Sequence, residues 1–346
     1  MSDNQVHFGG PDRPVGLLRD LLALRVARVP AGGSIDWVAY YLRDRRLAAA
    51  LVEAHQRGVA VRVTLDGRPR TPHANDAVIE ILTAGLGNGL RVVRSHLDGT
   101  PLGKIARPRL HEKLYCFSHP SPVAFVGSFN LSSDSPEGDP EVIEIIGDHD
   151  RAHNLLVELR DPDLVQGLTD HARVLHTARH GCFARFAPSA NRAMQHNGVS
   201  IYFWPRAGRH PIMRFLLDLE RGARVRIAAS HISGFSSLRG FCALAARGVK
   251  IEILTESTRR RVPVEAEQRL IRAGISVRRL IEDEWIPMHN KFVLIETSSQ
   301  KSTIFGSFNW SESSYRFNRE IAVATEDPLL FKAFSDRWDR LAAVAD

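Results

Sequence analysis

Residues 110–117 read Leu-His-Glu-Lys-Leu-Tyr-Cys-Phe, and residues 288–295 read Met-His-Asn-Lys-Phe-Val-Leu-Ile. Each segment is followed by the tetrapeptide Gly-Ser-Phe-Asn, at residues 127–130 and 306–309. The interval from His to Ser is 17 residues in the first copy and 18 in the second. The apolar run after each lysine predicts a buried strand, and alternation along a strand places the His and the Lys on one face. The chain therefore contains one structural unit twice.

The match extends outward from these segments through most of the chain. In both halves an Ala- and Leu-rich helix ends in Arg-Gly-Val, at residues 57–59 and 247–249, and an apolar strand follows. Glycine in that place is typical of a helix C-terminus, where the chain turns into a left-handed conformation. Strands and helices alternate in this way in both halves, which favours α/β layers.

We therefore predict an α/β fold made of two similar halves with mostly parallel central sheets. The halves are expected to be related by a pseudo-two-fold axis, with the active site between them. The predicted boundaries are residues 1–150 for the first half, 151–195 for a connecting segment without a clear strand pattern, and 196–346 for the second half.

The composition is that of a folded protein, since 44% of the 346 residues are hydrophobic and 25% are charged. No stretch approaches the length of an apolar membrane span, and the N-terminus lacks the pattern of a secretory signal. The three cysteines are too few and too scattered for a disulfide framework or a metal cluster. We therefore expect a cytoplasmic protein with no transmembrane segment. The net charge of +7 and the pI near 9.6 favour an anionic partner, but only weakly.

Lysine is scarce in this chain, and its placement is informative. Only six of the 46 basic residues are lysine, and two of the six, Lys113 and Lys291, stand in the repeated segments. Elsewhere arginine serves wherever a general cation is sufficient. These two positions therefore require a compact ammonium group that makes point contacts, not a planar guanidinium.

The repeated residue types suit phosphoryl transfer. A neutral imidazole can attack phosphorus and a protonated one can donate to the leaving oxygen, while Lys and Asn donate to the non-bridging oxygens. A glutamate that accepts from the far ring nitrogen fixes the tautomer. One half supplies one histidine, so two halves meeting at an axis supply both, and no metal or other cofactor is expected. The candidate catalytic residues are His111, Lys113, Ser128, Asn130, Glu141, His289, Lys291, Ser307, Asn309 and Glu320.

Both segments resemble the HxK…GSxN…E pattern of the phospholipase D superfamily, over nearly the whole chain. The resemblance implies a metal-independent phosphodiesterase that acts through a covalent phosphohistidine, and one copy of the chain is enough to form the site. The family favours Asn two residues before the Glu. Asn318 fits this pattern, whereas the first half has Asp139.

The first half-site is therefore the less typical one, and its acidic turn suggests a division of labour. Negative charge from Asp139 and Glu141 would stabilise the imidazolium of His111. On this basis His111 is predicted to be the proton donor and His289 the nucleophile.

The substrate is less constrained than the chemistry. The Gly-Ser-Phe-Asn-Trp segment at 306–310 resembles the nuclease-like branch, and Arg68, Arg70 and Arg259–Arg261 follow matching strands where they could line a phosphate-binding rim. We therefore expect a nuclease on DNA or RNA, with nucleic acid a more probable partner than phospholipid. The alternatives are a phospholipase D or phosphatidyltransferase similar to cardiolipin synthase, an enzyme of another small diester, and a catalytically weak phosphate-binding module. Solvated loop charges are an equally good explanation of the arginines.

Overall fold

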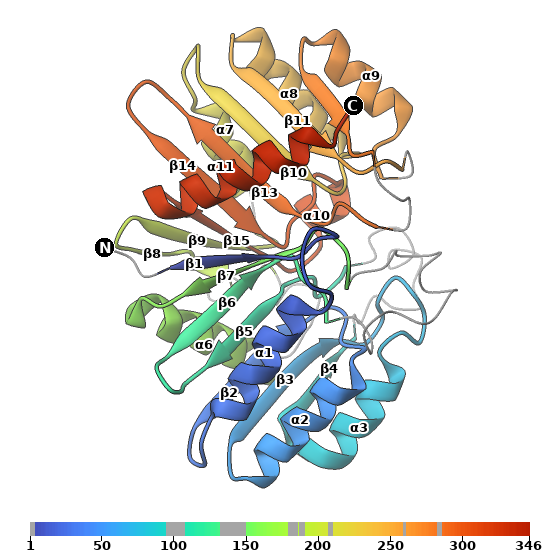
Figure 1. Ribbon diagram of the computed structural model, residues 1–346, viewed down its shortest axis with the longest axis vertical. Helices are drawn as coiled ribbons and strands as arrows, with labels where there is room; N and C mark the ends of the chain where they lie inside the picture. The colour runs from blue at the N-terminus through green and yellow to red at the C-terminus, as the bar shows by residue number, and fades with distance from the viewer. Residues whose placement is uncertain are drawn as a thin grey trace.

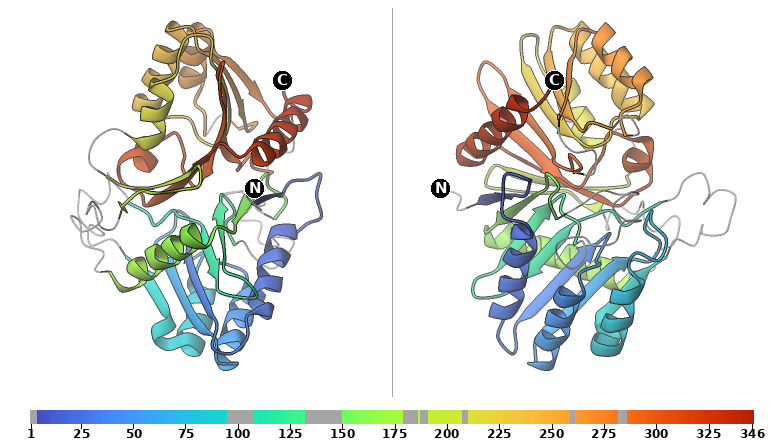
Figure 2. Two further views of the ribbon diagram at one scale, coloured as in Figure 1. Left: turned by 90° about the vertical axis from the view of Figure 1, so that its left-hand side faces the viewer. Right: turned by 45° about the vertical axis from the view of Figure 1, so that its right-hand side comes forward.

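The structure is a computed structural model in which the two halves of the chain lie one above the other (Figure 1). It describes residues 4–94, 108–131, 150–178, 186, 191–206, 210–258, 261–281 and 286–346. Each half builds one sheet, and helices lie against both faces of each sheet (Figures 1 and 2). The predicted α/β class and the duplication are confirmed.

The two sheets have the same strand order. In the described part of the first half the order is β1 (Gln5–Phe8), β7 (Leu155–Leu159), β6 (Val123–Gly127), β5 (Leu114–Phe117), β2 (Ser34–Ala39), β3 (Ala60–Asp66) and β4 (Leu90–Val93). In the second half it is β8 (Met194–His196), β9 (Val199–Trp204), β15 (Glu320–Thr325), β14 (Lys301–Gly306), β13 (Lys291–Glu296), β10 (Arg224–Ala229), β11 (Lys250–Thr255) and β12 (Ser276–Arg279). Strands β5 and β13, which follow the two His-x-Lys segments, therefore occupy equivalent places.

Both sheets are mixed, with fewer parallel pairs than predicted. Parallel pairing is confined to β2, β3 and β4 and to β10, β11 and β12, whereas the other neighbours are antiparallel. The cause is the short turn that joins β5 to β6 and β13 to β14. A hairpin this tight can join only antiparallel strands, because a parallel pair needs a long crossover.

The expected connecting segment, residues 151–195, is also different from the prediction. It contains β7, which pairs with β1 and β6, and helix α6 (Pro162–Thr177), which packs on the first sheet. The run Leu155–Leu159 is buried throughout and uniformly apolar except for Glu158. Such a run is typical of a central strand, and its place after a polar stretch concealed it.

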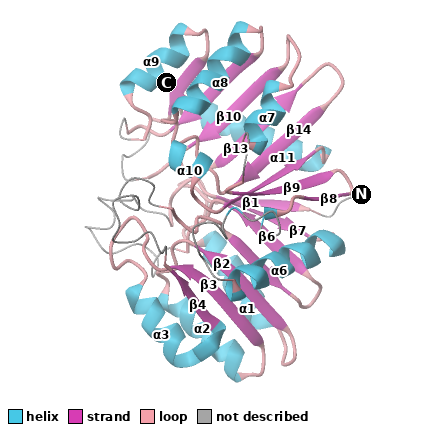
Figure 3. Ribbon diagram, turned by 180° about the vertical axis from the view of Figure 1, so that it is seen from behind, coloured by secondary structure: helices cyan, strands magenta, loops and turns pink. Residues whose placement is uncertain are grey.

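The helices cover the sheets in the same way in the two halves. The first sheet carries α1 (Leu17–Arg28), α2 (Arg45–Gln56) and α3 (Asp76–Leu86) on one face and α6 on the other. The second carries α7 (Pro211–Leu217), α8 (Phe235–Ala246) and α9 (Val264–Arg272) on one face and α11 (Pro328–Ala343) on the other (Figure 3). Gly58 and Gly248, which follow α2 and α8, have φ of 91° and 86°, as predicted for helix ends. No described helix is both long and apolar enough to span a bilayer.

One hydrophobic core joins the two halves. It combines Val38 and Leu114 of the first sheet with Phe203 and Phe292 of the second, together with the inner sides of α6 and α11. Backbone bonds also cross between the halves. The Arg319 N–H donates to Arg109 O at 2.8 Å, and the His111 N–H donates to Arg319 O at 2.8 Å. The chain therefore folds as one body in which the two repeated segments are held together.

The glycine of each Gly-Ser-Phe-Asn segment is required by the neighbouring strand. A Cβ built at Gly306 would lie 2.2 Å from the Ile321 carbonyl oxygen, and one at Gly127 would lie 2.1 Å from that of Leu155. Contacts this short with backbone cannot be relieved by a side-chain rotation. Packing therefore requires glycine at this position of the motif, whereas the chemistry of the site requires the serine that follows it.

We predict that Gly306→Ala lowers the free energy of unfolding by about 1–3 kcal/mol, because the methyl group must displace β15. Urea denaturation followed by circular dichroism measures the change. Ser299→Ala, in the exposed turn between β13 and β14, serves as the control and should unfold like the wild type. An unchanged midpoint for Gly306→Ala would contradict the packing argument.

Candidate active site

The two candidate histidines hold partners from opposite halves. His111 Nδ1 lies 2.8 Å from Glu320 Oε2, and His289 Nδ1 lies 2.7 Å from Asn154 Oδ1. Both histidines are mostly buried, with 8% and 5% of their surfaces exposed. These two bonds link the half-sites into one site between the halves.

Glu320 is held by four donors in addition to its place on β15. Its Oε2 accepts from His111 and from Ser307 Oγ at 2.6 Å, and its Oε1 accepts from Ser314 Oγ at 2.7 Å and Asn318 Nδ2 at 3.2 Å. Burial alone would raise the pKa of Glu320, but His111, Lys113 and Ser307 together lower that pKa, so the carboxylate is ionised. An ionised carboxylate only accepts, and therefore the proton of His111 is on Nδ1.

His111 is neutral in this environment. Burial lowers the pKa of His111 to about 4, which outweighs the carboxylate of Glu320 that raises it. The charge of Lys113 lowers it further. A neutral ring with hydrogen on Nδ1 has its lone pair on Nε2, which is the form that attacks phosphorus.

Asn154 is the structural counterpart of Glu320, and sequence reasoning missed it. Strand register pairs Gly127 with Leu156 and Gly306 with Ala322, so Asn154, just before β7, and Glu320, the first residue of β15, occupy equivalent places. Glu141 was predicted instead because it stands as far from its Asn as Glu320 does, but it lies outside the described residues. The signal that could have found Asn154 is the apolar run that follows it, which matches the run after Glu320.

The two lysines are buried beside the histidines, as expected for a phosphate site. Lys113 Nζ donates to the His111 carbonyl at 2.7 Å, and Lys291 Nζ donates to the His289 carbonyl at 3.1 Å. Burial lowers the pKa of Lys113 to about 7, and burial together with the charge of Lys113 lowers the pKa of Lys291 well below its ordinary value. A phosphate anion bound beside the two lysines would stabilise their ammonium forms.

The serines and asparagines of the repeated tetrapeptides lie around this centre. Ser307 Oγ donates to Glu320, and in the first half Ser128 Oγ lies 3.5 Å from Asn154 Oδ1 and accepts from the Leu155 N–H. The serines therefore position the partners of the histidines. Asn130 is buried, and the Asn309 N–H donates to Ser314 Oγ at 2.9 Å.

Tyr40 is a further residue at this centre that the motif did not predict. Its ring centroid lies 4.9 Å from that of His111, and Lys113 Nζ lies 5.1 Å from the Tyr40 ring centroid. The ring shields the first half-site from water and its face favours the nearby cation.

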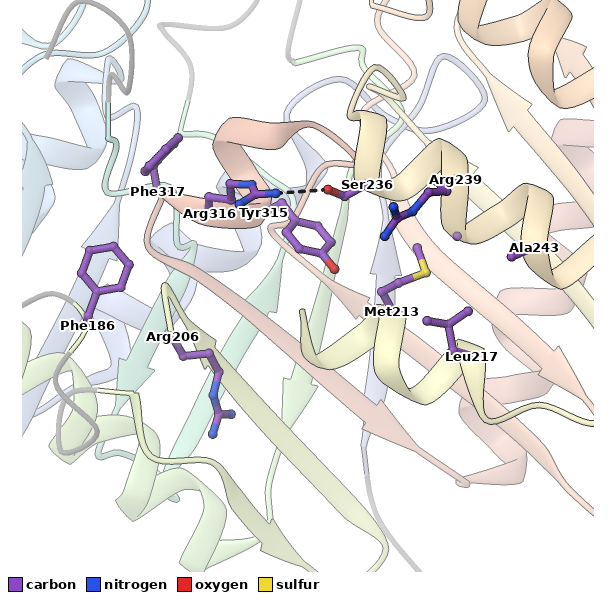
Figure 4. Close-up of a pocket in the computed structure, with 11 residues that line it drawn as sticks. Phe186, Arg206, Met213, Leu217, Ser236, Arg239, Ala243, Tyr315, Arg316 and Phe317 are labelled. Atoms are coloured by element: carbon purple, nitrogen blue, oxygen red, sulfur yellow. Dashed lines mark hydrogen bonds between the residues drawn. The ribbon is translucent and has the colours of Figure 1, made fainter. Parts of the chain in front are cut away.

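A separate hollow lies on the outer side of helix α10 (Glu312–Arg316), as Figure 4 shows. Its volume is about 660 Å³, and α7, α8 and α10 supply most of its wall. None of the candidate catalytic residues lines it. Ser314 points from α10 to Glu320, whereas Tyr315 and Arg316 of the same helix line the hollow, so α10 separates the two regions.

One cluster in the described part of the chain could hold a cation. The ligand atoms of Asp161, Asp163 and His196 lie within 4.8 Å of one another, on the N-terminus of α6 and on β8. None of the three is a motif residue, and acidic residues commonly gather at a helix N-terminus without a metal.

A family model described as "Cardiolipin synthase, PLD-like domain" matches residues 30–161 and 220–342, well over half of the chain. The chain belongs to the phospholipase D superfamily. The Danio rerio protein "Mitochondrial cardiolipin hydrolase" is 30% identical over 169 residues, which are 46% of this chain and 72% of that protein. A phospholipase D-like enzyme of the phosphodiesterase type, as the motifs predicted, is thereby confirmed.

Solved structures agree on the fold. A phosphatidylserine synthase from Haemophilus influenzae superposes with a TM-score of 0.68 at 12% identity, over 99% of this chain and 87% of that one. A polyphosphate kinase from Porphyromonas gingivalis gives 0.64 at 14% identity, over 97% of this chain and 50% of that one. At such low identity these likenesses establish the phospholipase D arrangement of two halves and nothing about the substrate.

The buried lysines predict that anion binding depends on pH. Tungstate, a dianion that mimics phosphate, should bind tightly when the pH is below 7. Its affinity should fall as the pH rises and Lys113 loses its proton. Titration calorimetry between pH 6 and pH 9 measures this. Lys113→Met should weaken binding at pH 6 about tenfold or more, because a charged hydrogen bond is lost.

Lys301→Met removes an exposed lysine at the start of β14 and serves as the control, with an expected affinity equal to that of the wild type. The same tungstate affinity at pH 6 and pH 9 would show that the lysines do not hold the anion.

Proposed function

We propose that this chain is a metal-independent phosphodiesterase that hydrolyses or transfers phospholipid headgroups through a covalent phosphohistidine on His111. The observation that carries the mechanism is the pairing of His111 with a carboxylate and of His289 with an amide. The positive charge that the reacting phosphate needs is available from Lys113 and Lys291, both buried beside the histidines.

The phospholipid substrate is supported by the comparisons. The matching family model bears the name of cardiolipin synthase, and the matching Danio rerio protein is named a cardiolipin hydrolase. Both names concern diesters of glycerol phosphate. This support outweighs the resemblance of residues 306–310 to nucleases, so we now place phospholipid before nucleic acid.

In the first step the Nε2 lone pair of His111 attacks phosphorus and the bond to the leaving oxygen breaks. The phosphorylated ring keeps its hydrogen on Nδ1 and becomes cationic, and the carboxylate of Glu320 at 2.8 Å stabilises that cation. A neutral amide would stabilise it far less. His111 is therefore the better nucleophile of the two.

His289 protonates the leaving oxygen in the same step. Its Nδ1–H donates to the neutral amide oxygen of Asn154 at 2.7 Å, so the protonated ring lacks a carboxylate at this position and gives up its Nε2 proton more readily. In the second step neutral His289 takes a proton from water or an acceptor alcohol. The oxygen attacks phosphorus, the P–N bond breaks and His111 is restored.

This assignment is the reverse of the one predicted from the acidic turn. That prediction rested on Asp139 and Glu141, which lie outside the described residues. Glu320 places a carboxylate oxygen 2.8 Å from His111 Nδ1, and it stabilises the phosphorylated cation as well as the protonated one. We therefore propose His111 as the nucleophile.

The assignment predicts where a covalent intermediate accumulates. With bis(p-nitrophenyl) phosphate, whose leaving group needs no proton, His289→Gln should still be phosphorylated and then hydrolyse slowly. Acid quench and mass spectrometry should place the phosphoryl group on His111. His111→Gln should form no intermediate and release no burst of nitrophenol. A phosphoryl group on His289 in the His111→Gln variant would reverse the assignment.

The substrate and the metal independence are tested together. We expect the purified protein to cleave short-chain cardiolipin or phosphatidylglycerol in mixed micelles, with a rate unchanged in EDTA. Single-stranded DNA, duplex DNA and RNA form the second arm, since the net charge of +7 also suits a polyanion. Cleavage of nucleic acid alone would overturn the phospholipid proposal, and activity lost in EDTA but restored by Mg²⁺ or Zn²⁺ would overturn the mechanism.

A further inference from the structure

A third histidine lies beside the second half-site. Register pairs Ala229, the last residue of β10, with Lys291, so Ser230 and His231 follow the strand alongside the His-x-Lys segment. Their counterparts after β2 in the first half are Tyr40 and Tyr41. Strands β2 and β10 begin at equivalent positions, because Ser34 pairs with the first residue of β3 as Arg224 pairs with the first residue of β11. The second half therefore places an imidazole where the first has a phenol. The candidate catalytic machinery described above does not use it.

Hydrogen bonds around Ser230 provide a donor for one ring nitrogen of His231. Arg261 Nη1 bonds to Glu256 Oε2 at 2.9 Å and donates to Ser230 Oγ at 3.2 Å. Ser230 Oγ lies 3.0 Å from His231 Nδ1. Ser230 Oγ accepts from the guanidinium and can direct its own hydrogen to Nδ1 of His231. The hydrogen of the neutral ring is then on Nε2, where it can be donated.

The surroundings of His231 are strongly cationic. Burial lowers the pKa of His231 well below its ordinary value, and the charges of Arg261, Lys291 and Arg70 act in the same direction. The ring is thus a neutral donor in a positive field. The residue is partly exposed to solvent.

Arg70 contributes to this field from the first half. Its backbone N–H donates to Tyr40 Oη at 2.7 Å, and Tyr40 in turn lies against His111. The Arg70 side chain is exposed, and no acidic partner is recorded for it in the described part of the chain. It is one of the arginines that the sequence suggested for a phosphate-binding rim. Arg70 and His231 therefore belong to opposite halves, and the charge of Arg70 acts on His231.

We propose that the Nε2–H of His231 and the guanidinium of Arg70 form a subsite for a second anionic group of the substrate, next to the scissile phosphodiester. Lys113 and Lys291 already supply positive charge to the scissile phosphate. The hydrogen-bond donor of His231 and the cation of Arg70 are therefore available to a second phosphate. Substrates with two phosphates a few bonds apart fit this arrangement, and those with one phosphate do not use it. The inference rests on the proposed function for its substrate class.

The test compares two lipids that differ in the second phosphate. Short-chain cardiolipin and short-chain phosphatidylglycerol are assayed in the same micelles with wild type, His231→Gln and Arg70→Gln. For each variant we expect kcat/KM on cardiolipin to fall about tenfold, mostly through KM, which is the scale of one lost charge-assisted hydrogen bond. On phosphatidylglycerol it should stay within about twofold of the wild type. Arg272→Gln removes an exposed arginine of α9 and serves as the charge-matched control.

A second measurement does not depend on lipid cleavage. Titration calorimetry compares glycerol 1,3-bisphosphate with glycerol 3-phosphate on the His289→Gln variant. The bisphosphate should bind about tenfold tighter, and adding His231→Gln or Arg70→Gln should remove that difference.

Equal losses on both lipids, or no loss on either, would overturn the subsite. So would equal affinities for the two glycerol phosphates. If the wild type cleaves neither lipid while the bisphosphate preference is present and depends on His231, the proposed function fails and the subsite stands.

Discussion

Each candidate catalytic imidazole depends on a hydrogen-bond partner from the other half of the chain. His111 needs Glu320 of β15 to hold its hydrogen on Nδ1, and His289 needs Asn154, which precedes β7. Neither half could orient its own histidine if the other were displaced. The shared core and the backbone bonds around Arg319 are thus conditions for the chemistry as well as for stability. This explains why the repeated unit occurs twice in one folded body.

The cross-pairing also makes a symmetric scaffold chemically asymmetric. One pair of equivalent positions holds a carboxylate in one half-site and an amide in the other. Another pair holds a phenol after β2 and an imidazole after β10. In-line displacement requires unlike partners on the two sides of phosphorus, one neutral and one protonated. Duplication supplies the geometry for both sides, and a few substitutions at equivalent positions then assign their roles. The equivalent strand pairing in the two halves allows these substitutions without a change of register.

Local pattern was enough to predict the class of fold and most of the candidate site. The His-x-Lys segments, the apolar runs after them and the helix-ending glycines are each determined by neighbours in sequence, and they identify the strands and the duplication. The orientation of strands was mispredicted, because alternation of strands and helices does not reveal where a tight hairpin replaces a crossover. β7 was missed because it follows residues 132–149, whose insertion breaks the spacing shared by the halves.

Asn154 was missed for a related physical reason. Spacing along the chain suggested Glu141. Which residue lies beside a catalytic histidine is decided by strand register, and register is set by pairing across the sheet. Only the pairing of Gly127 with Leu156 shows that Asn154 takes the place of Glu320. The same limit applies to Tyr40 and His231, whose roles come from strands far away in sequence. A motif therefore identifies the groups that react, whereas the groups that set their protonation and their substrate depend on tertiary contacts.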